Sequence, residues 1–231
     1  MVLLALFLPA ATQAGPRDDL VTAARAFDDS ALRYGDDNAK ARPVRKWTEP
    51  IRLAFDNPGA APNLVELTRQ AVKTIAAEAD ISIVDLAAKD ATGTMVVYFD
   101  ENGLFGRAGD CIAQNWMRND WAIRRGELRI NPTRMRDIDR CVTHESMHAF
   151  GFNSHPHAAL SILSYVYKAQ RTLTDLDRNL IHTLYDPRMT LGLKPAPASQ
   201  LACRILGERL GSSADDVTTV CTDRKGPVPS Y

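Results

Sequence analysis

"HESMHAFGFNSH", residues 144–155, is the stretch on which the interpretation of this chain depends. On an α-helix, residues four positions apart lie on one face, one turn above the other. His144 and His148 would therefore present two imidazole rings to a common point, and zinc accepts neutral imidazole nitrogen at about 2.0–2.1 Å. Glu145 would lie beside the ion, rotated by about 100° from His144. A carboxylate there can take a proton from a water molecule that attacks a carbonyl group.

A third metal ligand is predicted in the bend that follows the helix. Gly151 can adopt the positive φ that lets the chain turn back sharply. From its reach we expect His155 to complete three protein ligands, with His157, beyond Pro156, as the alternative. Three histidines would leave a fourth position for water, which is the open geometry of a catalytic zinc site.

Other interpretations of the histidines remain open at this stage. His144 and His148 could be ordinary surface histidines of a polar helix. Cys141 lies three residues before His144 and shares its helix face, so a cysteine thiolate could close the site around a structural zinc ion. The remaining histidine, His182 in "NLIHTLY", is interpreted as a structural helix residue.

The composition is that of an ordinary globular chain with no preference for polyanions. The chain has 231 residues, 45% of them hydrophobic and 24% charged, enough for one good-sized domain with an appendage. Lys and Arg total 28 and balance 28 Asp and Glu, so no net positive field attracts nucleic acid or anionic lipid. We expect no nucleic-acid partner.

The first 14 residues resemble an export signal. An apolar run extends from Val2 to Leu8, and Thr12 and Ala14 suit the small-residue positions before a cleavage site. The run is too short to span a bilayer. We therefore expect a secreted or periplasmic protein without stable membrane insertion after signal cleavage; the alternative is a buried N-terminal strand.

Four cysteines agree with export. They form an even set without a CxxC pair, and outside the cytosol they would tend to form two disulfides. Three connectivities are possible, and we favour the sequence neighbours, Cys111 with Cys141 and Cys203 with Cys221. The alternative is a set of free, buried thiols in a cytosolic protein.

Hydrophobic periodicity predicts a mixed α+β fold with a partly antiparallel sheet. A helix is expected over residues 63–79 with Asn63 as N-cap, and the motif helix over 137–150 with Asp137 as N-cap and Gly151 as its C-terminal glycine. Thr174 and Asp177 form a carboxylate variant of the capping box. The other expected elements are helices over 17–34, 173–185 and 200–211, strands over 47–55, 81–86, 94–100, 111–117 and 127–132, and a Pro-rich connector over 186–199.

With these elements in view, the chain resembles the metzincin zinc proteases, whose signature is HExxHxxGxxH followed by a Met-turn. Residues 144–155 resemble the signature, and "SILSY", residues 161–165, resembles the Met-turn. In this chain Ser154 stands at the signature's third histidine position and His155 follows it, and Leu163 replaces the methionine. The chain also resembles a family of exported bacterial proteins of unknown function.

The resemblance implies a metzincin-like domain with a twisted mixed sheet, an active-site helix and a small C-terminal subdomain. It suggests residues 1–14 as signal peptide, 15–46 as N-terminal helix and linker, 47–186 as catalytic domain and 187–231 as C-terminal appendage. Zn²⁺ would be held by His144, His148 and His155, with Glu145 as general base in the hydrolysis of a peptide or protein substrate. Tyr165 would stabilise the oxyanion or serve as a core tyrosine.

Two other functions are compatible with the same site residues. In the first, the chain is a catalytically inactive, zinc-stabilised binding or cell-envelope interaction module. In the second, it is a hydrolase that acts on a non-peptide amide.

Overall fold

The computed structural model describes residues 15–35, 40–56, 61–86, 90, 92–99, 111–133, 137–157, 159–222 and 224, so the predicted export signal lies outside the described residues. In chain order the elements are α1 (Pro16–Ala31), β1 (Arg33–Tyr34), β2 (Lys40–Ala41), β3 (Ile51–Phe55), α2 (Pro62–Glu78), β4 (Ile83–Asp85), β5 (Met95–Phe99), β6 (Cys111–Met117), β7 (Ile123–Ile130), α3 (Ile138–Ala149), α4 (Asp175–Tyr185), α5 (Pro195–Leu210) and α6 (Ala214–Cys221).

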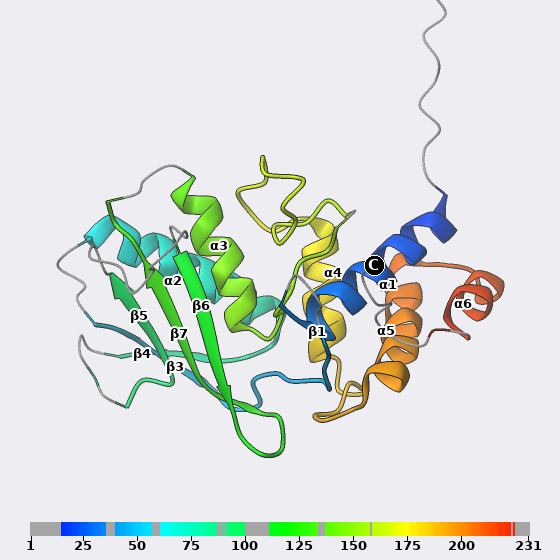
Figure 1. Cartoon of the computed structure of the whole chain (residues 1–231), viewed down its shortest axis with the longest axis horizontal. Helices are drawn as coiled ribbons and strands as arrows, with labels where there is room; N and C mark the ends of the chain where they lie inside the picture. Colours follow the sequence, from blue (N-terminus) through cyan, green and yellow to red (C-terminus); the bar gives the residue numbers. More distant parts are fainter. Residues whose placement is uncertain are drawn as a thin grey trace, which may run out of the picture.

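The main sheet has five strands in the order β4-β3-β5-β7-β6 (Figure 1). The pairs β3–β4, β3–β5 and β5–β7 are parallel, and the edge strand β6 is antiparallel to β7. A separate two-stranded ribbon joins β1 to β2. The predicted mixed α+β class with a partly antiparallel sheet is therefore confirmed.

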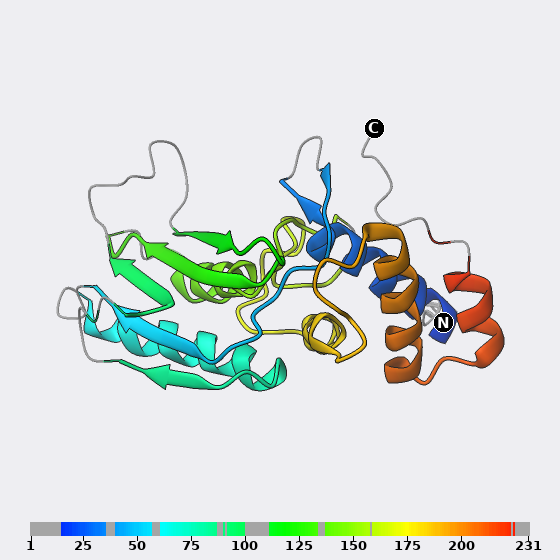
Figure 2. The ribbon, with the colours of Figure 1, turned by 90° about the horizontal axis from the view of Figure 1, so that it is seen from below.

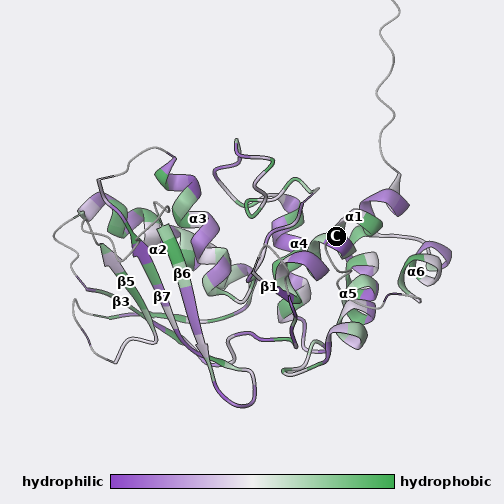
Figure 3. Ribbon diagram, viewed as in Figure 1, coloured by the Kyte–Doolittle hydropathy of each residue, from purple (hydrophilic) through white to green (hydrophobic). Residues whose placement is uncertain are grey.

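One face of the sheet carries the core. In β5 the side chains of Met95, Val97 and Phe99 are buried and alternate with less buried residues, the period expected of a strand covered on one side. Helices α2 and α3 lie side by side over this face, and α3 contacts β6 and β7 (Figure 1). Hydropathy colouring shows hydrophilic segments along β6 and β7 (Figure 3). This packing places the motif helix beside the antiparallel edge strand.

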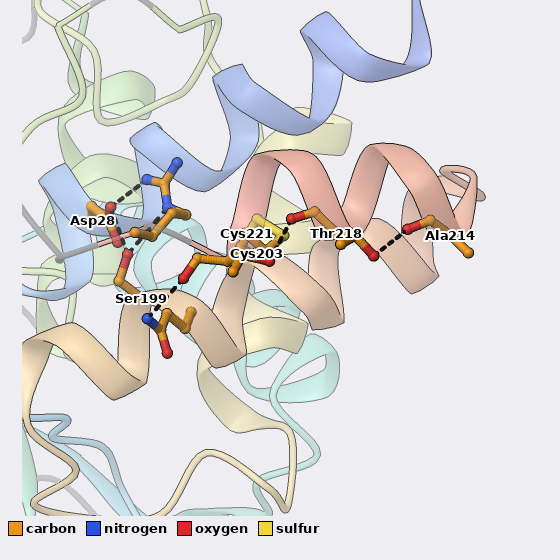
Figure 4. Close-up of a disulfide and its surroundings, with 9 residues drawn as sticks. Asp28, Ser199, Cys203, Ala214, Thr218 and Cys221 are labelled. Atoms are coloured by element: carbon orange, nitrogen blue, oxygen red, sulfur yellow. Dashed lines mark hydrogen bonds and ion pairs between the residues drawn. A yellow bond between two sulfur atoms is a disulfide. The ribbon is translucent and has the colours of Figure 1, made fainter.

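The remaining helices pack together at the other end of the molecule. Helix α1 contacts α4, α5 and α6 (Figure 2). The Cys203–Cys221 disulfide joins α5 to α6, and Ser199 Oγ donates a 2.9 Å hydrogen bond to the buried carboxylate of Asp28 on α1 (Figure 4). Arg224 also pairs with Asp28. The proposed division of the chain at residues 46/47 and 186/187 stays a prediction.

Several predicted element boundaries are corrected by proline chemistry. Helix α2 has Ala61 as N-cap, so the prediction of Asn63 is wrong, because Pro62 occupies the first helical position, where its missing N–H is harmless. Helix α5 begins at Pro195, inside the predicted connector, for the same reason. Strand β3 begins at Ile51, directly after Pro50, rather than at residue 47. Helix α6 and the early start of β7 were outside the predicted elements.

Both predicted disulfides are confirmed. Cys111 pairs with Cys141, and Cys203 pairs with Cys221. Cys141 is therefore no thiolate ligand, and the alternative interpretation of a structural zinc site closed by its thiolate is wrong. Disulfides are typical of proteins from oxidising compartments. Within the described part of the chain, no helix is both long and apolar enough to cross a membrane.

Candidate metal centre

Three histidine nitrogens converge beside the C-terminal half of α3. The Nε2 atoms of His144 and His148 lie 3.0 Å apart, and that of His155 lies 3.0 Å from the first and 3.1 Å from the second. His144 and His148 come from successive turns of α3, and His155 comes from the loop that follows the helix. The structure thus brings together the three predicted ligands, and together they could hold a metal ion.

Backbone carbonyl groups fix the tautomer of the two helical histidines. The Nδ1 atom of His144 lies 2.9 Å from the carbonyl oxygen of Ile162, and that of His148 contacts the carbonyl oxygen of Phe152. A carbonyl oxygen only accepts hydrogen bonds, so each Nδ1 carries the proton. Each Nε2 then points a lone pair at the common centre, which is the arrangement of metal-binding imidazoles.

Burial keeps His144 neutral. The residue is 5% exposed, and desolvation holds its pKa well below 6.5, helped by the neighbouring His148 and opposed by the hydrogen bond to Ile162. Neutral imidazole is the form that binds a metal ion.

The chain turns back sharply after α3 at Gly151, as predicted from the sequence. Gly151 has φ +107°, and a Cβ atom there would lie 2.7 Å from the backbone oxygen of Arg45. Ser154, at the third histidine position of the signature, turns away and donates a 2.8 Å hydrogen bond to the oxygen of Gly35. This detour accommodates the extra residue and lets His155 reach the other two rings. His157 is exposed and lies outside the group, near Asp29.

The N-terminal segment supports the same loop. The oxygen of Ser30 accepts hydrogen bonds from the backbone N–H groups of Asn153, at 2.8 Å, and of Ser154, at 3.2 Å. The N–H of Gly35 donates to the oxygen of Asn153 at 3.3 Å. The end of α1 and the start of the β1–β2 ribbon therefore help to position His155.

The last carbonyl groups of α3 are satisfied by side chains from other elements. Asn115 Nδ2 on β6 donates to the oxygen of His148 at 2.8 Å, and Trp47 Nε1 donates to the oxygen of Ala149 at 2.9 Å. The Tyr185 hydroxyl on α4 donates to the oxygen of Phe150 at 3.0 Å. Helix C-termini leave such carbonyl groups unpaired, so these bonds hold in place the end of α3 that carries His148. The sequence carried no local signal for them.

A buried carboxylate holds the turn that orients His144. The Asp177 side chain accepts hydrogen bonds from Ser161 Oγ at 2.5 Å and from the Ile162 N–H at 2.9 Å. It also accepts the N–H of Thr174, which completes the predicted capping box of α4. Leu163, at the Met-turn position, is fully buried. The sequence indicates Asp177 as a cap of α4 but carries no local signal for its contact with the turn.

The two predicted catalytic side chains border the histidine group. The Ala113 N–H on β6 donates a hydrogen bond to the Glu145 carboxylate, and burial raises the pKa of this carboxyl to about 8, opposed by that bond and by Arg140. The ring of Tyr165 stacks on His155 with centroids 3.9 Å apart, and the residue is 51% exposed.

The donor set suits a divalent transition metal. Nitrogens bound to tetrahedral zinc at 2.0–2.1 Å lie about 3.3 Å apart, close to the 3.0–3.1 Å separations of the three Nε2 atoms. Without a cation, the lone pairs of His144 and His148 would face each other at 3.0 Å with no proton between them.

Comparison with protein-family models and with curated proteins gives no significant match. Among solved structures, the chain is similar to a crystal structure of myroilysin, with a TM-score of 0.42 and 14% identity, covering 75% of this chain and 97% of that one. A second myroilysin structure gives a TM-score of 0.43 and 13% identity, covering 70% of this chain and 95% of that one. At these scores the likeness assigns neither a family nor an activity to this chain.

Proposed function

We propose that this chain is a zinc-dependent, metzincin-like metallopeptidase that hydrolyses peptide bonds. The observation that carries the proposal is the convergence of three imidazole Nε2 atoms, two of which have their lone pairs fixed toward one point by Nδ1–H bonds to backbone carbonyl groups. Imidazole donors suit several transition metals, and a set of three histidines with an open position is typical of catalytic zinc.

His144, His148 and His155 would hold the ion. When bound, zinc would lower the pKa of a coordinated water and polarise the scissile carbonyl. Burial keeps the His144 imidazole neutral and therefore ready to bind. His157 has no part in the proposed ligand set.

Glu145 is the proposed general base. Its carboxylate accepts the Ala113 N–H of the edge strand, and this bond would hold it beside the point where the imidazoles converge. There it would take the proton of the attacking water and pass it to the leaving amine. Tyr165, stacked on His155, would donate a hydrogen bond from its phenol as negative charge develops on the carbonyl oxygen.

We further propose that the protein acts outside the cytosol on peptide or protein substrates. The two disulfides support an oxidising compartment, and residues 1–14 would serve as the export signal. The predicted catalytic domain, residues 47–186, contains all of the proposed ligands and both catalytic side chains.

The test is the zinc content and peptide cleavage of purified protein, measured by metal analysis and mass spectrometry of a peptide mixture. Glu145→Gln should keep one zinc per chain and lose at least about 100-fold in cleavage rate, because the general base is gone. Glu66→Gln, on the exposed surface of α2, is the matched control and should cleave like the wild type. Tyr165→Phe should keep zinc and lower kcat ~100-fold.

Wild-type cleavage by Glu145→Gln would refute this mechanism. A chelator separates the enzyme from a zinc-stabilised binding module. Loss of cleavage with unchanged circular dichroism supports the enzyme, whereas unfolding on chelation indicates a structural ion.

A further inference from the structure

A cavity of about 490 Å³ lies alongside the edge strand β6. One part of its wall is formed by residues 113–117 of β6, and a second part by Tyr34, Arg42 and Arg45 of the N-terminal segment, with Trp121 and Asn153 completing it. Among the described residues that line this cavity, none is acidic.

Residues that line the cavity also contact the histidine group or its neighbours. Ala113, in its β6 wall, holds the Glu145 carboxylate through its N–H, and Asn115 in the same wall donates to the oxygen of His148 at 2.8 Å. Asn153 lies two residues before His155 in the ligand loop. A chain bound at the histidines would therefore reach the cavity by following β6.

Two guanidinium groups belong to the second part of the wall. The guanidinium carbon of Arg45 lies 5.4 Å from the centroid of the Tyr34 ring, and the guanidinium carbon of Arg42 lies 5.9 Å from the same centroid. Arg45 is 1% exposed, and one terminal nitrogen donates to the oxygen of Arg33 at 3.0 Å. Its Nε has no hydrogen-bond partner.

The positive charges of Arg42 and Arg45 have no carboxylate partner within the described part of the chain. Burial lowers the pKa of Arg45 to about 10; the neighbouring Tyr34 opposes this shift, and the charge of Arg42 adds to it. No carboxylate pairs with either arginine in the ion pairs of the described residues. Burying a cation without a counter-ion is unfavourable, and guanidinium groups form their strongest hydrogen bonds with carboxylates. Binding of an anionic ligand at this part of the wall would therefore stabilise the two positive charges.

We infer that the cavity receives a carboxylate of the substrate, held by Arg42 and Arg45, and that the protein selects acidic peptides. The inference rests on the proposed peptidase function. An extended chain rises roughly 3.3 Å per residue, so the stretch from Ala113 to Met117 spans roughly 13 Å. The carboxylate then lies within about four residues of the scissile bond, as an Asp or Glu side chain or as the peptide C-terminus.

The experiment measures binding to the zinc-loaded Glu145→Gln protein, which should not cleave its ligands. Fluorescent peptides with Glu or Gln at one position in turn, all C-terminally amidated, are compared by anisotropy. At the preferred position the Glu peptide should bind at least tenfold more tightly. A second pair, identical Gln peptides with a free or amidated C-terminus, distinguishes a terminal carboxylate from a side chain.

Arg42, which is partly exposed, is the residue to change, because Arg45 is buried and its replacement could unfold the protein. Arg42→Gln, added to Glu145→Gln, should reduce the preference to less than threefold, and Arg42→Glu should reverse it toward a Lys peptide. Arg17→Gln, an exposed change of equal charge on α1, should keep the tenfold preference.

Three results would each overturn the inference. They are equal binding of carboxylate and amide peptides, no binding of any carboxylate peptide at millimolar concentration, and a preference that survives Arg42→Gln. Cleavage of the same peptides by wild-type protein tests the proposed function separately. Cleavage without a carboxylate preference refutes only the cavity assignment, and a preference without cleavage refutes only the peptidase.

Discussion

At the scale of single residues, the third ligand is the sharpest prediction. His155 Nε2 lies 3.0 and 3.1 Å from the other two Nε2 atoms, whereas His157 is exposed near Asp29. His155→Ala should lower zinc affinity by at least about 100-fold, because a protein ligand is lost. His157→Ala is the matched control and should bind zinc like the wild type in a competition titration with a chromogenic chelator. The reverse result would move the metal centre to the other histidine.

Gly151 gives a second residue-scale prediction. A Cβ at this position would meet the Arg45 backbone oxygen at 2.7 Å, and φ +107° is strained for any other residue. Gly151→Ala should lower the free energy of unfolding by about 3 kcal/mol, from backbone strain and the displaced segment together.

Gly211 separates these two effects. It has φ +67° but no atom within 4 Å of an added Cβ, so Gly211→Ala should cost only about 1 kcal/mol. Denaturant unfolding of both variants measures the difference. Equal losses would show that contact with Arg45 adds nothing to the requirement for glycine.

At the scale of elements, the turn at 161–165 depends on the start of α4. Asp177 accepts hydrogen bonds from Ser161, Ile162 and Thr174, and the Ile162 oxygen orients His144. Asp177→Asn leaves fewer acceptor lone pairs for these buried donors, which should cost about 2 kcal/mol of unfolding free energy. Zinc affinity should fall as well, because the His144 ring loses its fixed partner.

Asp175→Asn is the control for this change. Asp175 lies in the same first turn of α4 but is exposed. It removes the same charge near the helix N-terminus and should leave zinc affinity unchanged in the same titration. If both variants bound zinc equally well, the turn would not depend on the Asp177 carboxylate.

The elements also show how far the sequence alone could predict the site. The i,i+4 spacing of His144 and His148 and the glycine after the helix carry the geometry locally, so both were predictable. The caps on the α3 carbonyl groups come from Trp47, Asn115 and Tyr185, residues that are distant in sequence. Such long-range hydrogen bonds leave no periodic pattern, because they depend on how the sheet and α4 pack against α3.

The start of α5 and the cavity beside β6 could not be predicted from the sequence either, because both depend on how distant segments pack together. Proline inside "KPAPAS" is equally compatible with a connector and with the first turn of a helix, and only packing against α1 decides for α5. Arg42 and Arg45 lie three residues apart in the sequence, and this spacing alone does not indicate a shared cavity. They line one cavity only because the N-terminal segment folds beside β6.

At the scale of the whole molecule, the two disulfides connect different parts of the fold and should have separable effects. Cys203–Cys221 joins α5 to α6 across 18 residues, at the end of the molecule away from the sheet. Cys111–Cys141 joins the start of β6 to α3 across 30 residues. Closing loops of these lengths contributes about 3 kcal/mol each to the free energy of unfolding. Replacing either pair with alanine should therefore lower stability by a similar amount.

Only one of the two pairs should affect the metal centre. Cys141 lies three residues before His144 on α3, and Cys111 lies two residues before Ala113, which holds the Glu145 carboxylate. Replacing both Cys111 and Cys141 with alanine should weaken zinc binding and slow peptide cleavage at temperatures where the chain is still folded. Replacing both Cys203 and Cys221 should leave zinc affinity and kcat within about twofold of wild type, since sites without shared contacts behave independently. Equal loss of zinc in both double variants would mean that the centre depends on global stability, and no longer on the link between β6 and α3.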